Sequence, residues 1–348
     1  MVAIIQKDIR LLSKVQIQEA LATWGEPKFR ATQIHEWLWQ KSAVTFEGMS
    51  NLSKKLRERL EEHFVIRPIQ EDKTQQSSDG TLKSRYRLHD GHLIESVLIP
   101  MVEDNRFTAC VSTQVGCSLT CSFCATGRMG RVRNLDAAEI YDQVVLTNKQ
   151  SLLNFGLPLT NIVYMGMGEP LLTYANVLKS VEHITSPEGL GMSAKRITVS
   201  TAGIAKMIKK LADDKVRFNL ALSLHAADDA KRDKIMPINE HNNLEALTEA
   251  LDYFYMNTKN RITFEYIAFQ NFNDGPEDAA NLVKLCRRIP ANVNIIEYNP
   301  IDNAPFEKSA DDKIDKFARY LRNHDIDVTV RKSRGKDIDA ACGQLANK

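Results

Sequence analysis

The 348-residue sequence has no long apolar stretch, no strong excess of charge and few cysteines. It contains no run of about 18 apolar residues, so we expect no segment that spans a membrane. Its 46 lysines and arginines nearly balance 44 aspartates and glutamates, so a nucleic-acid partner would have to be bound by local patches. The opening MVAIIQKDIRLLSK lacks the apolar core and cleavage site of a secretion signal. Six cysteines in such a chain favour a reducing cytoplasm over a disulfide framework.

The region before residue 106 divides into two parts. Residues 1–65 read as short amphipathic helices, because apolar residues recur at three-to-four spacing in 17–24, 34–38 and 52–64. Residues 66–105 follow as an extension. Its polar, turn-rich start, IRPIQEDKTQQSSDG, is interpreted as a linker, and KSRYRLHDGHLIESVLIP is typical of a β-hairpin turning at Asp90-Gly91.

Residues 106–348 show strand-like runs that alternate with helical stretches. The runs are TACVST, NIVYMG, RITVST, FNLALSLH, ITFEYIAF and VNIIEYN. Such alternation predicts βαβ units with a parallel sheet, and six units favour a partial (β/α)6 barrel of the TIM type. We therefore expect an α/β protein with a small N-terminal helical domain and a β-hairpin extension. Its chemistry should lie at the carboxyl ends of the strands.

A cluster of three cysteines, Cys117, Cys121 and Cys124, follows the first of these strands. If six cysteines were placed at random in a chain of this length, the expected number of triplets with this spacing would be about 0.002. Coincidence is therefore a weak explanation. A zinc site would want a fourth ligand, and an electron-transfer cubane normally takes four thiolates. Three thiolates can hold three irons and leave the fourth iron open to a substrate.

Polar residues lie at the ends of the later strands. Gly166-Met167-Gly168-Glu169-Pro170 follows the second strand, where glycine lets a ligand approach the backbone and Glu169 could pair with an ammonium group. About half of such short matches would be ordinary turns. Ser200, Ser223, His225 and Asn299 end the third, fourth and sixth strands, which favours a common site. A lone histidine such as His225 is also often a satisfied core group.

Four further residues have reactive side chains whose spacing alone does not assign them a role. Cys110 and Cys342 lie outside the triplet, and each alone would be read as a buried thiol, as would Cys286. Glu95 shares a strand face with apolar residues, which would raise its pKa and suit a general base. An edge-strand glutamate that reaches solvent is an equally good reading of that pattern.

The CxxxCxxC spacing resembles that of the radical S-adenosylmethionine (SAM) superfamily. ACVSTQVGCSLTCSFCATG, VYMGMGEPL, SLH, RKSRGKDIDAACGQLA and the N-terminal WGEPKFRATQIHEWLWQK together resemble the RlmN family of bacterial RNA adenine-C2 methyltransferases, over essentially the whole chain. Lys336 stands where that family often has an acidic residue, outside any catalytic position. The resemblance implies a radical SAM methyltransferase. Its substrates would be an adenosine in the peptidyl-transferase region of 23S rRNA and the adenosine 3′ to the tRNA anticodon.

The resemblance also implies roles for individual residues. Cys117, Cys121 and Cys124 would hold one [4Fe–4S] cluster per chain. Two SAM molecules would be used per turnover, one to methylate Cys342 and one to supply a radical that removes hydrogen from that methyl. Cys110 would release the product through a transient disulfide with Cys342, and Glu95 would accept a proton. The residues implied in SAM binding are Gly168, Glu169, Ser200, Ser223, Leu224, His225 and Asn299.

The chemistry of the target explains why a carrier cysteine is needed. Carbon C2 of adenine is electrophilic and cannot attack the electrophilic methyl of SAM. A radical on the Cys342 methyl avoids that mismatch, and the thioether formed must then be broken by a second group. Cys286 receives no role.

The expected partners are 23S rRNA, tRNA and a flavodoxin-type electron donor, with the chain a cytoplasmic monomer. RNA phosphates could be met by basic residues beside the catalytic cysteines or in the N-terminal helices, although such charge runs are usually solvated faces. These residues are Arg128, Arg131, Arg133, Arg331, Lys332, Arg334, Lys336, Lys28, Arg30 and Lys41.

Two alternatives remain. A sibling methylase acts on C8 of the same rRNA adenosine, and the Glu169-Pro170 pair modestly favours the C2 type. A zinc-dependent RNA-binding module would instead use Cys110 with the three clustered cysteines.

Overall fold

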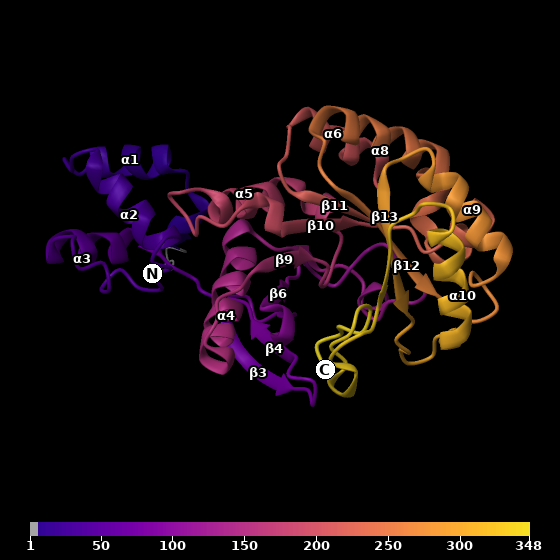
Figure 1. The fold of residues 1–348 in the computed structure, drawn as a ribbon. Coiled ribbons are helices and arrows are strands. Elements are labelled where there is room, and N and C mark those ends of the chain that lie inside the picture. Colours follow the sequence, from indigo (N-terminus) through magenta and orange to yellow (C-terminus); the bar gives the residue numbers. More distant parts are fainter. Residues whose placement is uncertain (1–5) are drawn as a thin grey trace.

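The computed structural model describes residues 6–348 as one large sheet with helices against it, and a separate group of helices at the N-terminal end (Figure 1). The N-terminal group contains α1 (Lys14–Ala22), α2 (Phe29–Trp39) and α3 (Lys54–His63). Ser13 and Ser53 cap the first turns of α1 and α3. The apolar stripe Ile17, Leu21, Ile34 and Leu56 is buried, as the three-to-four spacing predicts.

The N-terminal helices are attached to the rest of the molecule through α4 (Ala137–Phe155) and α5 (Tyr174–Thr185). Arg10 forms an ion pair with Asp142 of α4 at 2.8 Å. The ring of Trp39 stacks on His183 of α5 with ring centroids 3.5 Å apart. These contacts fix the position of the N-terminal helices beside the sheet.

The main sheet has ten strands in the order β14-β13-β12-β11-β10-β9-β6-β5-β4-β3, so it is open and not a closed barrel. Seven strands run parallel to their neighbours, from β6 to β14. They are β6 (Arg106–Cys110), β9 (Asn161–Tyr164), β10 (Ile197–Thr201), β11 (Asn219–Ser223), β12 (Ile262–Ala268), β13 (Ala291–Glu297) and β14 (Val328–Arg331). The six expected strands are all present, and β14 adds a seventh that the sequence analysis did not anticipate.

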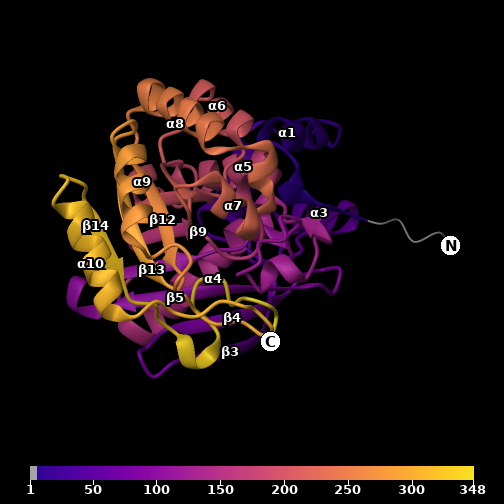
Figure 2. The ribbon, with the colours of Figure 1, turned by 90° about the vertical axis from the view of Figure 1, so that its right-hand side faces the viewer.

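Helices connect successive parallel strands and cover the outer face of the sheet (Figures 1 and 2). Besides α4 and α5 they are α6 (Ala205–Asp213), α7 (Asp229–Ile235), α8 (Leu244–Thr258), α9 (Pro276–Cys286) and α10 (Asp311–Arg322). Their apolar sides pack with the strands into a large hydrophobic core, and a second, smaller cluster includes Ile235 of α7. None of the helices within residues 6–348 combines the length and hydropathy needed to cross a membrane.

Three antiparallel strands extend the sheet: β3 (Gln70–Gln76), β4 (Leu82–Arg87) and β5 (Leu93–Met101). The expected hairpin is confirmed, because β4 pairs with β5 and Gly91 turns with φ +84°. The linker assigned to residues 66–80 is wrong, since β3 lies within it. As the outermost strand of the sheet, β3 exposes most of its polar side chains, so it carries no apolar alternation that would have marked it.

Candidate active site

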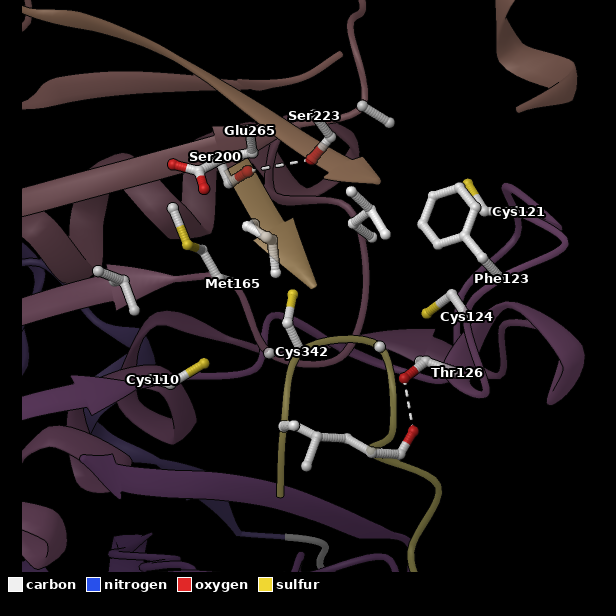
Figure 3. A pocket seen from close by; sticks show the side chains of 18 of the residues that line it. Cys110, Cys121, Phe123, Cys124, Thr126, Met165, Ser200, Ser223, Glu265 and Cys342 are labelled. Carbon is white, nitrogen blue, oxygen red and sulfur yellow. Dashed lines mark hydrogen bonds between the residues drawn. The ribbon is translucent and has the colours of Figure 1, made fainter. Parts of the chain in front are cut away.

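A cavity of about 230 Å³ lies at the carboxyl ends of the parallel strands, where the fold class predicts the chemistry (Figure 3). Its wall includes residues at the ends of β6 and β9 to β14. Two further segments complete it. They are the cysteine loop (residues 116–127) and the C-terminal segment (residues 333–348), which both contribute residues to the cavity wall.

The cysteine loop places Cys117, Cys121 and Cys124 on the cavity wall. Gly116 allows the loop to turn, because a Cβ there would lie 1.7 Å from the carbonyl oxygen of Gly130. Burial raises the pKa of the Cys117 thiol to about 11. Burial also raises the pKa of Cys121, and the two neighbouring thiols add to the effect. The three sulfurs therefore lie within electrostatic reach of one another.

These thiols suit an iron–sulfur cluster better than a single ion. Among residues 6–348, no three Cys, His, Asp or Glu side chains converge closely enough to share one ion, as the zinc alternative with Cys110 requires. In a [4Fe–4S] cubane each thiolate binds its own iron, so the sulfurs stand further apart. The donor set of three thiols on one short loop beside an open cavity fits such a cluster.

The Gly168-Glu169 pair lies beside the cysteine loop. Gly168 has φ +97°, and a Cβ there would lie 2.5 Å from Cβ of Gln114, so a larger residue would not fit. Glu169 is buried and lines the cavity. Its carboxylate accepts hydrogen bonds from the backbone N–H of Ala202 at 2.7 Å and of Leu171 at 3.0 Å, while burial raises its pKa. The remaining lone pairs of this oriented carboxylate are available to an ammonium group.

The strand-end residues divide into two groups. Ser200, Ser223 and His225 line the cavity, and the two serine hydroxyls lie 3.4 Å apart. Leu224 and Asn299 are buried but do not line it. Asn299 instead donates to the carbonyl oxygen of Cys342 at 3.4 Å, so it contacts the C-terminal segment.

His225 is both a hydrogen-bonded core residue and a residue of the cavity wall, the two interpretations that its sequence position left open. Its Nδ1 accepts the backbone N–H of Ile267 at 3.1 Å, which makes it a satisfied core group. Burial lowers its pKa to about 3, so the ring is neutral at physiological pH. The ring nevertheless lines the cavity and packs against the edge of Phe123. A neutral ring there can contact a ligand only as a flat surface or through Nε2.

Cys110 and Cys342 come from opposite ends of the catalytic region and meet at the same cavity (Figure 3). Cys110 is the last residue of β6 and is buried. Cys342 lies on the C-terminal segment, where its surface is exposed and lines the cavity. Burial raises the pKa of Cys110 to about 12 and that of Cys342 to about 11. All six cysteines are free, so no disulfide joins the pair in this structure. Cys286 lies on α9, away from the cavity wall.

Hydrogen bonds from three parts of the molecule hold the C-terminal segment in place. Glu297 accepts the N–H of Ser333 at 2.7 Å and pairs with Lys336 at 2.6 Å. Asp79, in the turn between β3 and β4, accepts the N–H of Gly335 at 2.9 Å. Thr126 of the cysteine loop donates to the carbonyl oxygen of Leu345 at 2.7 Å. The C-terminal segment thus connects the antiparallel extension, the parallel strands and the cysteine loop.

Glu95 lies in a different environment from the one expected. It is fully buried on β5, so it does not reach solvent, but its neighbours are not merely apolar. Lys83 lies 3.5 Å from Oε1, and the backbone N–H groups of Ala346 and Asn347 donate to Oε2 at 2.9 and 3.0 Å. It is absent from the cavity wall. The alternation in the strand sequence could not reveal Lys83 or the distant C-terminal residues.

Several basic side chains that were expected to contact RNA are bonded to other groups of the protein. Arg133 forms ion pairs with Glu139 at 2.8 Å and Asp90 at 2.5 Å, and Lys336 pairs with Glu297. Arg128 donates to the carbonyl oxygens of Asp302 and Asn303. These three side chains stabilise the protein itself.

Other basic groups are more accessible. Arg131 is exposed and contacts the side chain of Asn134 at 3.3 Å, and Lys332 is exposed at the rim of the cavity. Lys28 is exposed at the start of α2. Arg331 lies 3.7 Å from Glu265, and Arg334 contacts the carbonyl oxygen of Asp79 at 3.4 Å.

In the N-terminal helices two of the expected cations cover aromatic rings. Arg30 lies over Phe29 and Lys41 lies over Trp37, with Lys41 also paired to Glu36 at 3.3 Å.

The sequence analysis missed a carboxylate on the cavity wall. Glu265, on β12, is buried and lines the cavity near Ser200 and Ser223 (Figure 3). The available signal was a carboxylate within the apolar run ITFEYIAF, the same kind of signal that singled out Glu95.

Comparison with known proteins shows the family to which this chain is similar. Residues 8–66 match the family described as the ribosomal RNA large subunit methyltransferase N-terminal domain, and residues 111–283 match the radical SAM superfamily. A protein of Christiangramia forsetii, named as a probable dual-specificity RNA methyltransferase RlmN, is 56% identical over 99% of this chain and 97% of its own length. The dual-specificity RNA methyltransferase RlmN of a Nitratiruptor strain is 42% identical over 98% of each chain. The crystal structure of a radical SAM methyltransferase from Sphaerobacter thermophilus superposes with a TM-score of 0.92 at 40% identity, covering 98% of this chain and 100% of that one.

Proposed function

Since this chain belongs to the RlmN family of radical SAM RNA methyltransferases, we propose that it methylates C2 of one adenosine in the peptidyl-transferase region of 23S rRNA and of the adenosine 3′ to the anticodon in tRNAs. The observation that carries the proposal is the meeting of Cys110, Cys342 and the cysteine loop at one cavity. A methyltransferase that used SAM directly would need neither outlying thiol.

The cofactor would be held by residues at one side of the cavity. Cys117, Cys121 and Cys124 would bind one [4Fe–4S] cluster, and Glu169 would pair with the ammonium group of SAM. Ser200, Ser223 and His225 would contact the rest of that molecule, with Leu224 and Asn299 acting through backbone groups or through the C-terminal segment. When bound, the cluster and SAM supply an electron and a species that removes a hydrogen atom.

The two outlying cysteines would divide the covalent steps. Because burial raises the pKa of Cys342 to about 11, its thiol is protonated at neutral pH and must lose the proton as it accepts a methyl group. Loss of one hydrogen atom would let the methyl carbon bond to C2 of adenine, and the adduct would then give up one electron to the cluster and the C2 proton to Glu95. Cys110, after losing its own proton, would attack the Cys342 sulfur and form a disulfide with it. The bond from that sulfur to the bridging carbon would break, and its electron pair would pass to that carbon, which takes up a proton and becomes the methyl group.

Glu95 would accept the proton that leaves C2. Its Oε2 accepts the N–H groups of Ala346 and Asn347, whereas Oε1 has no hydrogen-bond partner within residues 6–348 and is the oxygen that would take the proton.

The proposal assigns the three regions different tasks. Residues 1–65 would be an RNA-binding accessory domain that adds contacts through Lys28 and its neighbours. Residues 66–105 would hold Glu95 and anchor the C-terminal segment, and residues 106–348 would carry the chemistry. The chain would act as a cytoplasmic monomer, with two SAM molecules per turnover and a flavodoxin-type electron donor.

Mass spectrometry of nucleosides from nuclease-digested RNA tests the proposal. RNA from cells that lack the gene should contain no 2-methyladenosine at either position, and the gene supplied in trans should restore it. Restoration of 8-methyladenosine instead would assign the chain to the C8 methylases. Unchanged 2-methyladenosine in both 23S rRNA and tRNA would contradict the function.

A further inference from the structure

Glu265 is a buried carboxylate at the end of a barrel strand, and none of the roles assigned above uses it. It lies on β12 in register with Ser223 of β11 and Asn294 of β13. Residues in register on parallel strands share a face, so all three point to the same side of the sheet. Its side chain lines the cavity, with 4% of the residue exposed. Glu265 is therefore as much a part of the cavity wall as Ser223.

The two oxygens of Glu265 differ in their partners. Oε1 accepts a hydrogen bond from the side-chain amide of Asn294 at 2.8 Å. Oε2 is buried and has no hydrogen-bond partner within residues 6–348. The guanidinium of Arg331 lies 3.7 Å from it, an ion pair at the rim that is too long for a hydrogen bond. A buried polar atom without a partner costs free energy, so it points to a donor supplied by a ligand.

The position of Glu265 relative to the thiols indicates which part of a ligand it meets. Its charge contributes to the raised pKa of Cys342, so the two groups lie within electrostatic reach. The cysteine loop lies on the other side of Cys342 (Figure 3). A SAM molecule with its amino-acid end at the cysteine loop and its reactive carbons at Cys342 would place its ribose against the wall formed by Ser200, Ser223 and Glu265.

We propose that Oε2 of Glu265 accepts a hydrogen bond from a ribose hydroxyl of SAM, with Ser200 and Ser223 beside it. This inference rests on the proposed use of SAM by this cavity. Carboxylates recognise ribose hydroxyls in the same manner in dinucleotide sites. A site built to bind a hydroxyl strongly rejects an analogue without it, because its buried acceptor then stays unpaired. Glu265 is thus a positioning residue that sets the ribose, and with it the reactive carbons, relative to Cys342.

Binding of SAM and of its 2′-deoxy and 3′-deoxy analogues tests this inference without any turnover. Equilibrium dialysis of the cluster-reconstituted protein should give at least one deoxy analogue about tenfold weaker binding than SAM, as expected for a lost charge-assisted hydrogen bond. Glu265→Gln should reduce that ratio to about threefold, because a neutral amide accepts a weaker bond. Glu265→Ala should abolish the ratio.

Glu139→Gln is the matched control, because Glu139 is equally buried but pairs with Arg133 outside the cavity. It should keep the full discrimination. Iron content and the melting temperature identify any variant that fails to fold, and Glu265→Gln preserves the side-chain volume if the alanine variant does not fold.

Two results would overturn the inference. One is unchanged discrimination between SAM and both deoxy analogues in Glu265→Gln and Glu265→Ala. The other is a loss of RNA affinity in these variants with normal SAM binding, which would assign the carboxylate to RNA. Failure of the wild-type protein to bind SAM at all would instead contradict the proposed function. A wild-type protein that discriminates between SAM and the deoxy analogues but does not methylate RNA would contradict the proposed function and leave the Glu265 inference standing.

Discussion

The cysteine loop and the C-terminal segment bring thiols to the same cavity in different ways. Within the cysteine loop, Cys117 and Cys124 lie seven positions apart, so their proximity follows from the chain itself. Cys342 lies 232 positions from Cys110 in the sequence (342 − 110) and reaches it because Glu297, Asp79 and Thr126 hold the segment from three sides. A local motif therefore supplies the cluster ligands, whereas the catalytic pair depends on the tertiary fold.

The largest expected effects come from alanine substitutions of the cysteines, and they differ between the cysteine loop and the C-terminal segment. Alanine at Cys117, Cys121 or Cys124 should abolish bound iron and all SAM cleavage, because only two thiolates would then remain to hold the cluster. Cys342→Ala should keep the iron but allow no methyl transfer to RNA. Iron and sulfide analysis beside a methylation assay measures both. Normal iron content in Cys117→Ala would show that Cys117 is not a ligand of the cluster.

Glu95→Gln is expected to lower RNA methylation by about 10²-fold to 10⁴-fold, the usual range for a lost general base. Methylation of Cys342 should persist, since that step precedes proton removal from adenine. Mass spectrometry of the Cys342 peptide and a methylation assay distinguish the two steps. Equal loss of both would indicate that Glu95 only holds Ala346 and Asn347.

The tether of the C-terminal segment has a predictable pH dependence. Burial acts to raise the pKa of Glu297, but hydrogen bonds from Lys336, Lys308 and Ser333 outweigh it and lower the pKa to about 2. Because the folded-state pKa is below the ordinary value of 4.5, the tether is at full strength above about pH 4.5 and weakens as pH falls toward 2.

Hydrogen exchange of residues 333–348 should therefore accelerate between pH 4.5 and 2 beyond its intrinsic pH dependence. Glu297→Gln should exchange faster at neutral pH and lose this acceleration. Helix α8 serves as the internal reference, since its hydrogen bonds and ion pairs run to residues such as Asp229, Lys209 and Arg288 and not to the C-terminal segment. Identical exchange in the variant and the wild type would show that other contacts hold the segment.

A smaller effect is expected from the basic residues that flank both regions. Arg131→Ala and Lys332→Ala should each weaken RNA binding and reduce the slope of log affinity against log salt by about one unit. Arg133→Ala is the matched control, because its guanidinium is paired with Glu139 and Asp90. Unchanged slopes for Arg131 and Lys332 would make them solvated surface charges.

The sequence predicted those features that local pattern determines. The spacing of Cys117, Cys121 and Cys124, the strand ends at Ser200 and Ser223, and the hairpin at Gly91 are all readable within short windows. Strand β3 was missed because a polar edge strand has no apolar period.

The environment of Glu95 was misjudged because its partners, Lys83 and residues 346–347, come from another strand and from the end of the segment. The meeting of Cys110 with Cys342 followed from family resemblance. Local sequence patterns do not predict a contact between residues that are so far apart in the chain.

The central claim, that Cys342 carries the methyl and Cys110 releases the product, is tested most directly by Cys110→Ala purified from cells. This variant should still attack adenine but stall with RNA joined to Cys342 through a one-carbon bridge. Denaturing electrophoresis should then show a retarded band that ribonuclease removes, and the Cys110→Ala, Cys342→Ala double variant should show none. If Cys110→Ala gives no nuclease-sensitive band, Cys110 is not the resolving thiol and the division of labour between the two cysteines is wrong.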